Sequence, residues 1–191
     1  MRIITGKHKG RKLLEIKKLR ELRPTTDKNR ETLFNILASA TFLKNLDFDL
    51  AKSDLLDVFS GSGSISFEAL SRGVKSVTLI DKEYKHIELS KQNAQIFQEE
   101  KNCFFITFDL SKPIFKSNKK YNLIYIDPPY NKGLIESSIQ NLLAANFIEK
   151  DAIIIAESSV YEKIDLEKLK NITFLEEKVY SKTIFSFFIN N

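Results

Sequence analysis

Cysteine and histidine are scarce in this sequence, and long apolar runs are absent. The single cysteine, Cys103, excludes an internal disulfide and a multi-cysteine zinc site, and its apolar neighbours predict a buried thiol. His8 and His86 have no cluster of other ligands around them, so we expect no metal site; the polar surroundings of His86 predict exposure to solvent. No stretch reaches the roughly 18–20 apolar residues of a membrane span, and no signal-peptide pattern opens the chain. We therefore expect a cytoplasmic, monomeric protein without membrane contact.

Positive charge is concentrated near the N-terminus. Residues 1–30 contain eleven Lys and Arg residues but only three Asp and Glu residues, a net charge of +8, whereas the whole chain carries +5. A basic segment on a mildly acidic remainder is typical of a protein that binds nucleic-acid phosphates. A solvated, charged terminus that binds nothing is the alternative interpretation of the same pattern.

The beginning of the chain predicts a short basic β-hairpin. Two strands are expected at Arg2–Thr5 and Arg11–Ile16, with glycines in the loop between them. Pro24-Thr25-Thr26 then predicts a turn and a helix N-cap, followed by apolar residues at helical spacing up to Ala40. We therefore divide the chain into a basic N-terminal hairpin, residues 1–23, which we expect to contact nucleic acid, and a main domain, residues 24–191.

From residue 54 onward, apolar strands alternate with helices. The predicted strands are Asp54–Phe59, Ser76–Ile80, Cys103–Phe108, Tyr121–Ile126, Ala152–Glu157, Ile172–Tyr180 and Thr183–Ile189. The predicted helices are Ser64–Arg72, Lys82–Gln98 and Leu134–Ala145, and Gly73 suits the C-terminal cap of the first. Near-continuous apolar runs are typical of parallel strands buried on both faces. The pattern predicts a doubly wound α/β fold: a mostly parallel seven-stranded sheet with helices on both faces and a final antiparallel pair.

The first of these strands leads into a glycine-containing loop. Asp57-Val58-Phe59-Ser60-Gly61-Ser62-Gly63 joins the strand directly to the next helix. Glycines at such a junction let the backbone turn tightly and approach a ligand closely. Two glycines are weak evidence alone, but the context of strand, loop and helix predicts a cofactor-binding loop.

Aspartates at the ends of four strands indicate which cofactor the loop binds. They are Asp57, Asp81, Asp109 and Asp127, and we expect them along one rim of the sheet. So many carboxylates would repel the pyrophosphate of a dinucleotide, and Ser66 replaces the third glycine of the dinucleotide fingerprint. S-adenosylmethionine carries a sulfonium and an ammonium group but no phosphate. The pattern therefore favours S-adenosylmethionine over a nicotinamide cofactor; solvated aspartates at ordinary turns are the alternative.

The segment Asp127-Pro128-Pro129-Tyr130 directly follows an apolar strand and predicts the acceptor site. An exocyclic base amine is a poor nucleophile, because its lone pair is conjugated into the ring. The Asp127 carboxylate and a backbone carbonyl near Pro128 can accept both amine hydrogens, which aims the lone pair at the methyl group. The prolines stiffen the backbone, and Tyr130 offers a face on which the base stacks. A proline turn that merely closes a strand is the structural alternative.

Together these motifs resemble the RsmD family of bacterial 16S ribosomal RNA guanine-N2 methyltransferases, along nearly the whole chain. The more specific parts of the resemblance are MRIITGKHKGRKL, Arg23-Pro24-Thr25-Thr26-Asp27 and Glu68-Ala69-Leu70-Ser71-Arg72-Gly73. The glycine loop and Asp127–Tyr130 are similar to those of many amino-methyltransferases. Ser60, Ser64 and Ser66 depart from the small or apolar residues expected around the glycines.

The resemblance implies a class I, Rossmann-like methyltransferase with S-adenosylmethionine as donor. It implies that the acceptor is the N2 amine of one guanine of 16S ribosomal RNA, position 966 in conventional numbering, in the 30S subunit. The implied cofactor-binding residues are Asp57, Ser60, Gly61, Gly63, Asp81 at the ribose and Asp109 at the adenine. The implied catalytic residues are Asp127, Pro128, Pro129 and Tyr130, and the implied RNA contacts are Lys9, Arg11, Lys12, Arg23 and Arg30.

Three other functions remain open at this point. A DNA adenine-N6 methyltransferase would use the same tetrapeptide, although the chain has no obvious separate target-recognition domain. A nicotinamide oxidoreductase would use the glycine loop without the acceptor segment. An RNA-binding assembly factor that has lost its activity would keep the basic N-terminus, but the intact Asp127–Tyr130 segment argues against it.

Overall fold

The computed structural model describes residues 1–15, 27–130 and 132–191, which form two compact units, Met1–Thr107 (unit 1) and Phe108–Asn191 (unit 2). The expected boundary after residue 23 falls between the first two of these ranges, so it lies where the structure gives no description. Within the described ranges, no helix is both long and apolar enough to cross a lipid bilayer.

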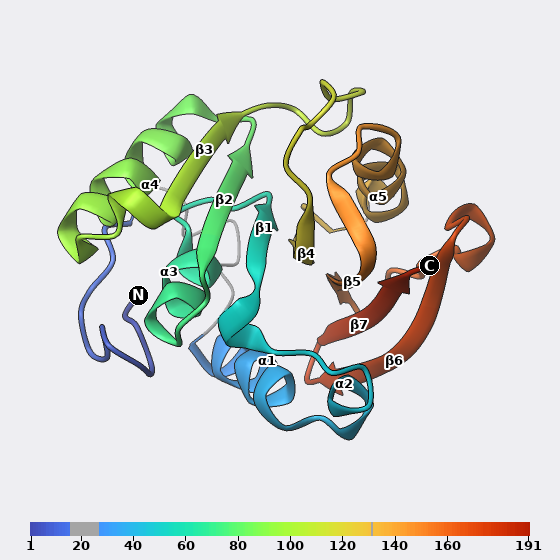
Figure 1. Cartoon of the computed structure of the whole chain (residues 1–191), viewed down its shortest axis with the longest axis horizontal. Helices are drawn as coiled ribbons and strands as arrows, with labels where there is room; N and C mark the ends of the chain where they lie inside the picture. The colour runs from blue at the N-terminus through green and yellow to red at the C-terminus, as the bar shows by residue number, and fades with distance from the viewer. Residues whose placement is uncertain (16–26, 131) are drawn as a thin grey trace. The chain divides into compact units, whose positions relative to one another are not determined.

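Unit 1 is built on three parallel strands in the order β3-β2-β1 (Figure 1). They are β1 (Asp54–Val58), β2 (Ser76–Asp81) and β3 (Cys103–Thr107). Val58 pairs with Ile80, and Asp81 pairs with Thr107, so the carboxyl ends of the three strands meet at one edge. Strands β1 and β2 are buried along almost their whole length, as their apolar runs predict.

Among the residues of unit 1 that the structure describes, four α-helices accompany the strands. They are α1 (Asp27–Ser39), α2 (Thr41–Lys44), α3 (Ser64–Ser71) and α4 (Tyr84–Phe97), with short 3-10 turns at Leu50–Lys52 and Glu100–Asn102. Helix α3 packs against β1 and β2, and α4 packs against β2 and β3 (Figure 1). Gly73 follows α3 with a φ of +99°, the left-handed conformation expected just after a helix C-terminus. The short helix α2 was not predicted, because four residues are too few to show a helical period.

Unit 2 contains four strands in the order β4-β5-β7-β6. They are β4 (Tyr121–Ile126), β5 (Ile148–Ser159), β6 (Ile172–Tyr180) and β7 (Thr183–Asn190); α5 (Leu134–Ala144) joins β4 to β5, and a 3-10 turn occupies Leu166–Lys168. Strands β4 and β5 are parallel, whereas β7 is antiparallel to both β5 and β6. The predicted final antiparallel pair is therefore confirmed, and all seven predicted strands are present.

The predicted N-terminal hairpin is not confirmed. Residues 1–15 form one isolated antiparallel bridge, between Arg2 and Lys12, in place of two strands. The side chains of Ile3 and Leu13 are only 1% and 6% exposed. This segment is therefore packed into unit 1 as part of its core and is not an appended arm. Three cross-strand backbone hydrogen bonds are present, from the N–H groups of Ile3, Gly10 and Leu13, and other backbone groups of the segment bind side chains of α3 and α4.

Glu68 of α3 holds the N-terminal segment in place. Its carboxylate accepts hydrogen bonds from the backbone N–H groups of Ile4 and Thr5, at 2.7 and 3.1 Å. The same carboxylate lies 2.8 Å from Arg72 Nε and 3.7 Å from Arg30 Nε. The side chains of Glu68 and Arg30 are both completely buried, and each has a second charged partner, Arg72 for Glu68 and Asp27 for Arg30. Removing either one would therefore weaken the charge compensation of the other in the core.

Single residues of unit 1 test two further expectations. Cys103 is buried, and burial raises the pKa of its thiol to about 12, so the predicted core thiol is confirmed. The expectation that His86 faces solvent is wrong, because its side chain is 15% exposed and its Nδ1 lies 3.1 Å from Asp81 Oδ1. His8 is also buried, and its Nε2 lies 2.6 Å from Glu99 Oε1.

Candidate active site

The glycine loop of unit 1 runs from the end of β1 to the start of α3. Phe59, Gly61 and Gly63 have φ angles of +65°, +55° and +78°; the left-handed conformation is costly for Phe59, and such strain is often found at functional sites. A Cβ on Gly63 would lie 2.7 Å from Phe67 and 2.8 Å from Leu79, so only glycine fits there. No atom of the described residues lies within 4 Å of a Cβ built on Gly61, so the loop is open at that point.

Asp57, one residue before the end of β1, is a buried carboxyl group. Its Oδ2 accepts hydrogen bonds from Ser66 Oγ at 2.6 Å and from the Ser66 N–H at 3.2 Å. Burial raises the pKa of Asp57 from 3.8 to about 7; the Ser66 hydrogen bonds oppose this rise, and the charge of Asp81 adds to it. The serine that replaces the third glycine of the dinucleotide fingerprint therefore binds this aspartate.

Asp81 ends β2 and connects the glycine loop to the start of α4. Its Oδ2 accepts a hydrogen bond from the Gly61 N–H at 2.9 Å, and its Oδ1 accepts one from the Glu83 N–H at 2.9 Å. His86 reaches the same Oδ1 from the first turn of α4. Asp57 and Asp81 lie close enough for their charges to interact, as their places on neighbouring strands predict.

Two buried polar residues of α4 support the loop and were not predicted. Ser90 Oγ donates to the Gly61 carbonyl at 3.1 Å, and Asn93 Nδ2 donates to the Ser62 carbonyl at 3.1 Å. Asn93 Oδ1 also accepts a hydrogen bond from the Leu14 N–H at 2.8 Å, and Asn93 Nδ2 donates to the Leu14 carbonyl at 3.3 Å. Their spacing of three residues puts both side chains on one helix face, and this polar pair is the sequence signal that could have identified them. Asn93 therefore joins the N-terminal segment to the glycine loop.

The loop residues fit a polar, positively charged ligand. Ser60 is buried, and its Oγ has no hydrogen-bond partner within the part of the chain that the structure describes. A buried hydroxyl without a partner is costly, and a polar ligand atom would satisfy it. A cation beside Asp57 would favour the ionised carboxylate that burial disfavours. Across residues 1–15, 27–130 and 132–191, no three His, Cys, Asp or Glu side chains gather as a metal site.

The acceptor segment lies in unit 2, directly after β4. Asp127 and Tyr130 are half-buried, Pro128 is buried, and Pro129 is exposed. Residues 127–130 are neither helix nor strand, in keeping with two prolines that cannot donate backbone hydrogen bonds. The segment thus leaves the end of a buried strand with a stiff backbone and a partly accessible carboxylate.

The four predicted rim aspartates are divided between the two units. Asp57 and Asp81 belong to unit 1, whereas Asp109 and Asp127 belong to unit 2. Asp109 is half-buried, and its Oδ1 accepts a hydrogen bond from the Ser111 N–H at 3.1 Å. Each aspartate lies at or near the carboxyl end of its strand, as predicted; that all four share one rim stays a prediction.

A buried glutamate of unit 2, also not predicted as a site residue, contacts the acceptor tyrosine. Glu157 lies near the end of β5, and its side-chain carboxylate accepts hydrogen bonds from Tyr125 OH and from Tyr130 OH, the latter at 3.4 Å. Burial raises the pKa of Tyr130 well above its usual range, and the charges of Asp127 and Glu157 add to the rise. The sequence signal for Glu157 is an acidic residue directly after the apolar run at 152–156.

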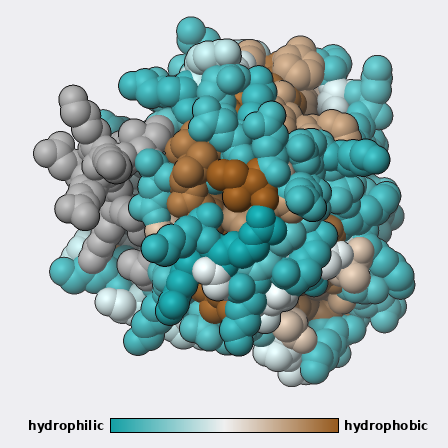
Figure 2. Space-filling view, turned by 90° about the vertical axis from the view of Figure 1, so that its left-hand side faces the viewer, coloured by the Kyte–Doolittle hydropathy of each residue, from teal (hydrophilic) through white to brown (hydrophobic). Residues whose placement is uncertain are grey.

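Three of the predicted RNA contacts lie on the surface of unit 1. Lys9 and Lys12 are exposed. Arg11 is also exposed, but its guanidinium stacks on Phe97 at 4.9 Å and donates to the Ile96 carbonyl. The surface on the left-hand side of Figure 1 is largely hydrophilic around a compact apolar patch (Figure 2).

The prediction that Arg30 contacts RNA is wrong. Its side chain is completely buried, and its Nη2 donates to Asp27 Oδ1 at 2.9 Å and to the Arg2 carbonyl at 2.6 Å. A guanidinium enclosed in this way cannot reach an RNA phosphate without opening the unit. Arg23 falls within 16–26, where the structure gives no description.

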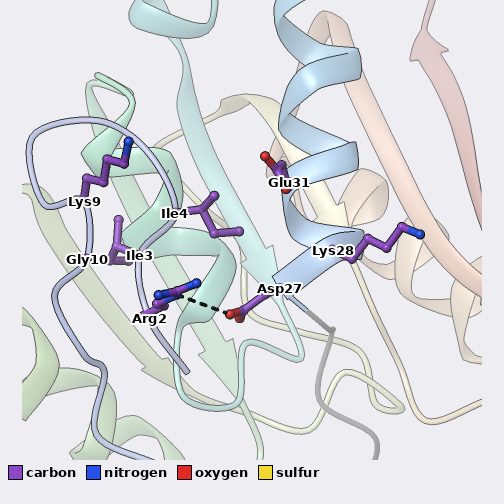
Figure 3. A pocket seen from close by; sticks show the side chains of 8 residues that line it. All are labelled: Arg2, Ile3, Ile4, Lys9, Gly10, Asp27, Lys28 and Glu31. Carbon is purple, nitrogen blue, oxygen red and sulfur yellow. Dashed lines mark ion pairs between the residues drawn. The ribbon is translucent and has the colours of Figure 1, made fainter.

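A pocket of about 290 Å³ lies between the N-terminal segment and the start of α1 (Figure 3). Its lining residues are Arg2, Ile3, Ile4, Lys9, Gly10, Asp27, Lys28 and Glu31. Arg2 Nε lies 3.9 Å from Asp27 Oδ2 across it. The lining carries charges of both signs and includes none of the glycine-loop residues, so this pocket is separate from the candidate cofactor loop.

Comparisons with known proteins identify the family of the chain and proteins similar to it. The family model described as "Conserved hypothetical protein 95" matches residues 1–189. Ribosomal RNA small subunit methyltransferase D of Buchnera aphidicola subsp. Acyrthosiphon pisum is 34% identical over 93% of this chain and 86% of that protein. The protein of the same name from Haemophilus influenzae is 31% identical over 93% of this chain and 88% of that protein. The solved structure of yhhF from Escherichia coli, a candidate methyltransferase, has a TM-score of 0.79 at 30% identity and covers 100% of this chain and 98% of that chain.

These similarities extend across both units and include the N-terminal segment. The coverage of the yhhF structure assigns the seven strands and their helices to the α/β methyltransferase fold. The family match includes the glycine loop, the acceptor segment and the residues that Glu68 binds. The chain belongs to the "Conserved hypothetical protein 95" family of methyltransferases, which is the RsmD family.

Proposed function

We propose that the protein transfers a methyl group from S-adenosylmethionine to the N2 amine of a guanine in 16S ribosomal RNA, guanine 966 in conventional numbering. The observation that carries this proposal is the segment Asp127–Tyr130 at the end of the buried strand β4, in a chain of this family. The ribosomal substrate is proposed because several relatives are named as small-subunit ribosomal RNA methyltransferases.

The residues of the glycine loop are proposed to hold the donor. S-adenosylmethionine supplies an electrophilic methyl group on a positively charged sulfur. The Asp57 carboxylate attracts the cationic methionine end, and the unpartnered Ser60 hydroxyl offers a hydrogen bond. Gly61 and Gly63 allow the close backbone approach, while Asp81 binds the ribose hydroxyls. Asp109 of unit 2 accepts the adenine amine in the same proposal.

The acceptor segment is proposed to orient the guanine amine. The Asp127 carboxylate and a carbonyl near Pro128 accept its two hydrogens, so the nitrogen lone pair points at the methyl carbon. The nitrogen–methyl bond would form as the sulfur–methyl bond breaks, so positive charge passes from the sulfur, which leaves as a neutral thioether, to the nitrogen, where the Asp127 carboxylate stabilises it. The proton then leaves to water. Tyr130 stacks on the base, and the two prolines keep the backbone stiff.

The basic N-terminus is proposed to bind the RNA backbone in the 30S subunit. The exposed cations of the first fifteen residues include Lys9, Arg11 and Lys12. Arg23 is the fourth residue within 1–23 that we propose as an RNA contact. Because this contact is made to phosphates, it contributes affinity and not base choice. Selection of one guanine then depends on the shape of the RNA at the acceptor segment.

The test is a transfer assay with S-adenosylmethionine that carries a labelled methyl group. We expect the label to enter the RNA of unmethylated 30S subunits and not duplex DNA. The variant Asp127→Asn keeps the size of the side chain but loses the negative charge, and we expect it to lower the rate by roughly 100-fold or more. Labelling of duplex DNA instead of RNA would support the adenine-N6 alternative, and no transfer to any substrate would support the inactive assembly factor.

A further inference from the structure

Glu157 is neither donor-binding nor acceptor-binding in the proposal above, yet it contacts the acceptor segment. We propose that Glu157 is a positioning residue that fixes the ring of Tyr130, and so sets the orientation of the guanine that stacks on it. This inference rests on the proposed function, because it takes Tyr130 as the face that receives the base.

The strand register brings Glu157 next to the acceptor segment. Ile126, the last residue of β4, pairs with Ala156 of β5, so Asp127 and Glu157 follow on neighbouring strands. Thr183 of β7 pairs with Ser159, two residues further along β5 and therefore on the same face as Glu157. The Thr183 side chain also shares a hydrogen bond with Tyr130. The Tyr130 hydroxyl is thus held by side chains from two strands of unit 2.

Burial makes Glu157 an effective anchor. Its side chain is 1% exposed, and a buried carboxylate is costly unless hydrogen bonds surround it. Tyr125, also buried, donates to Oε2, while Tyr130 donates to Oε1. A hydrogen bond from a phenol to a carboxylate is charge-assisted and directional. One oxygen thus binds a core tyrosine and the other binds a tyrosine of the acceptor segment.

The contact restrains a side chain that the local backbone does not fix. Residues 127–130 lie outside helix and strand, so Tyr130 has no regular neighbours on its own element. At 3.4 Å the hydrogen bond is long, since phenol-to-carboxylate bonds are usually about 2.7 Å. We therefore expect its loss to reduce the rate about tenfold and not to abolish it.

The experiment is a double-mutant cycle between Glu157→Gln and Tyr130→Phe, with Tyr125→Phe as the matched control. Each variant is assayed with labelled S-adenosylmethionine and unmethylated 30S subunits, and thermal midpoints check folding. We expect each of the first two variants to lower kcat about tenfold, with the KM for 30S within twofold of wild type. The double variant should be no slower than the slower single variant, because both changes remove the same contact. Tyr125→Phe removes the other phenol from the same carboxylate and should stay within twofold of wild type.

Two results would overturn the inference alone, provided that the wild type methylates 30S RNA. The first is a double variant about 100-fold slower than wild type, because the two changes then act independently. The second is a Tyr125→Phe variant as slow as Glu157→Gln, because Glu157 then has a general role in the core. If Glu157→Gln does not fold, Thr183→Val replaces it in the cycle, because it removes another partner of the same hydroxyl. A wild type that leaves 30S RNA unmethylated would overturn the proposed function, and this inference with it.

Discussion

Asp57 combines deep burial with a proposed place beside a cation. Burial raises its pKa to about 7, so near neutral pH this carboxyl holds a proton for part of the time. In the unfolded chain the group has lost its proton above about pH 4. Between about pH 4 and 7 the Asp57 carboxyl therefore binds more protons in the folded state than in the unfolded state. Its contribution to the free energy of unfolding falls as the pH rises through this window. A cationic ligand reverses this effect, because it stabilises the ionised form.

Binding of the donor should therefore release a proton from Asp57. We expect the affinity for S-adenosylmethionine to rise from pH 6 to pH 8. The rise between pH 6 and the Asp57 pKa of about 7 should be up to about tenfold. Calorimetric titrations in two buffers of different ionisation enthalpy would detect close to one proton released per donor at pH 6. Asp57→Asn is the control and should bind weakly with no proton release. Equal proton release in the wild type and Asp57→Asn would contradict this account of Asp57.

The residues of the candidate site differ in how far the sequence reveals them. Asp57, Asp81 and Asp127 lie at strand ends, and their local order alone predicts them. Glu157 and Asn93 escaped prediction, because their roles depend on partners about 30 to 80 residues away in the chain. No local pattern encodes such contacts, although an isolated polar residue on an apolar face is a useful signal.

At the scale of elements, strands and helices from residue 54 onward follow their apolar periods closely. The predicted bounds of β4, an apolar run, and of β6, a mixed polar and apolar strand, are those of the structure, because turn residues flank both. Strand β5 extends beyond its predicted apolar run, to Ile148–Ser159. The N-terminal hairpin failed for a different reason. Three cross-strand backbone hydrogen bonds of the expected ladder are present, but other backbone groups bind the distant side chains of Glu68, Ser71 and Asn93 instead of extending it. Two specific parts of the family resemblance, the segment 1–13 and the helix segment 68–73, thus contact each other within unit 1.

This contact predicts a large effect of Glu68 on stability. Glu68→Ala removes a buried counter-ion shared by Arg30 and Arg72, although Arg30 keeps its contact with Asp27, and it removes the acceptor for two backbone N–H groups. We expect the free energy of unfolding to fall by about 3–5 kcal/mol, measured by urea denaturation. Glu88→Ala is the control, since that glutamate pairs with Lys91 on the exposed surface of α4 and should leave the transition unchanged. A Glu68→Ala variant as stable as the control would contradict the role assigned to this carboxylate.

At the scale of the whole molecule, the proposal assigns most donor contacts to unit 1 and the acceptor segment to unit 2. The sequence predicted both sets of residues and the net positive charge of the N-terminus. It could not show that this basic segment is also part of the core, with Ile3 and Leu13 buried. Deleting the N-terminus would therefore remove part of the core of unit 1, so RNA binding is tested by removing charges.

We expect the double variant Lys9→Ala/Lys12→Ala to weaken binding of 16S ribosomal RNA and to reduce its salt dependence. Each lost phosphate contact should lower the slope of log affinity against log salt by about 0.7–0.9. Filter binding between 50 and 200 mM salt, roughly the range over which such contacts weaken, would measure the slope. Lys52→Ala/Lys75→Ala removes two exposed lysines elsewhere in unit 1 and should leave it unchanged. Equal slopes for both double variants would contradict the proposed RNA contact.

The position of the transferred methyl group tests the central claim most directly. Unmethylated 30S subunits are treated with the protein and labelled S-adenosylmethionine, and the RNA is digested to nucleosides for mass spectrometry. We expect the label in N2-methylguanosine, because the acceptor segment is proposed to hold both hydrogens of that amine. Label in a methylated adenine, on a ring carbon or on a ribose would contradict the account.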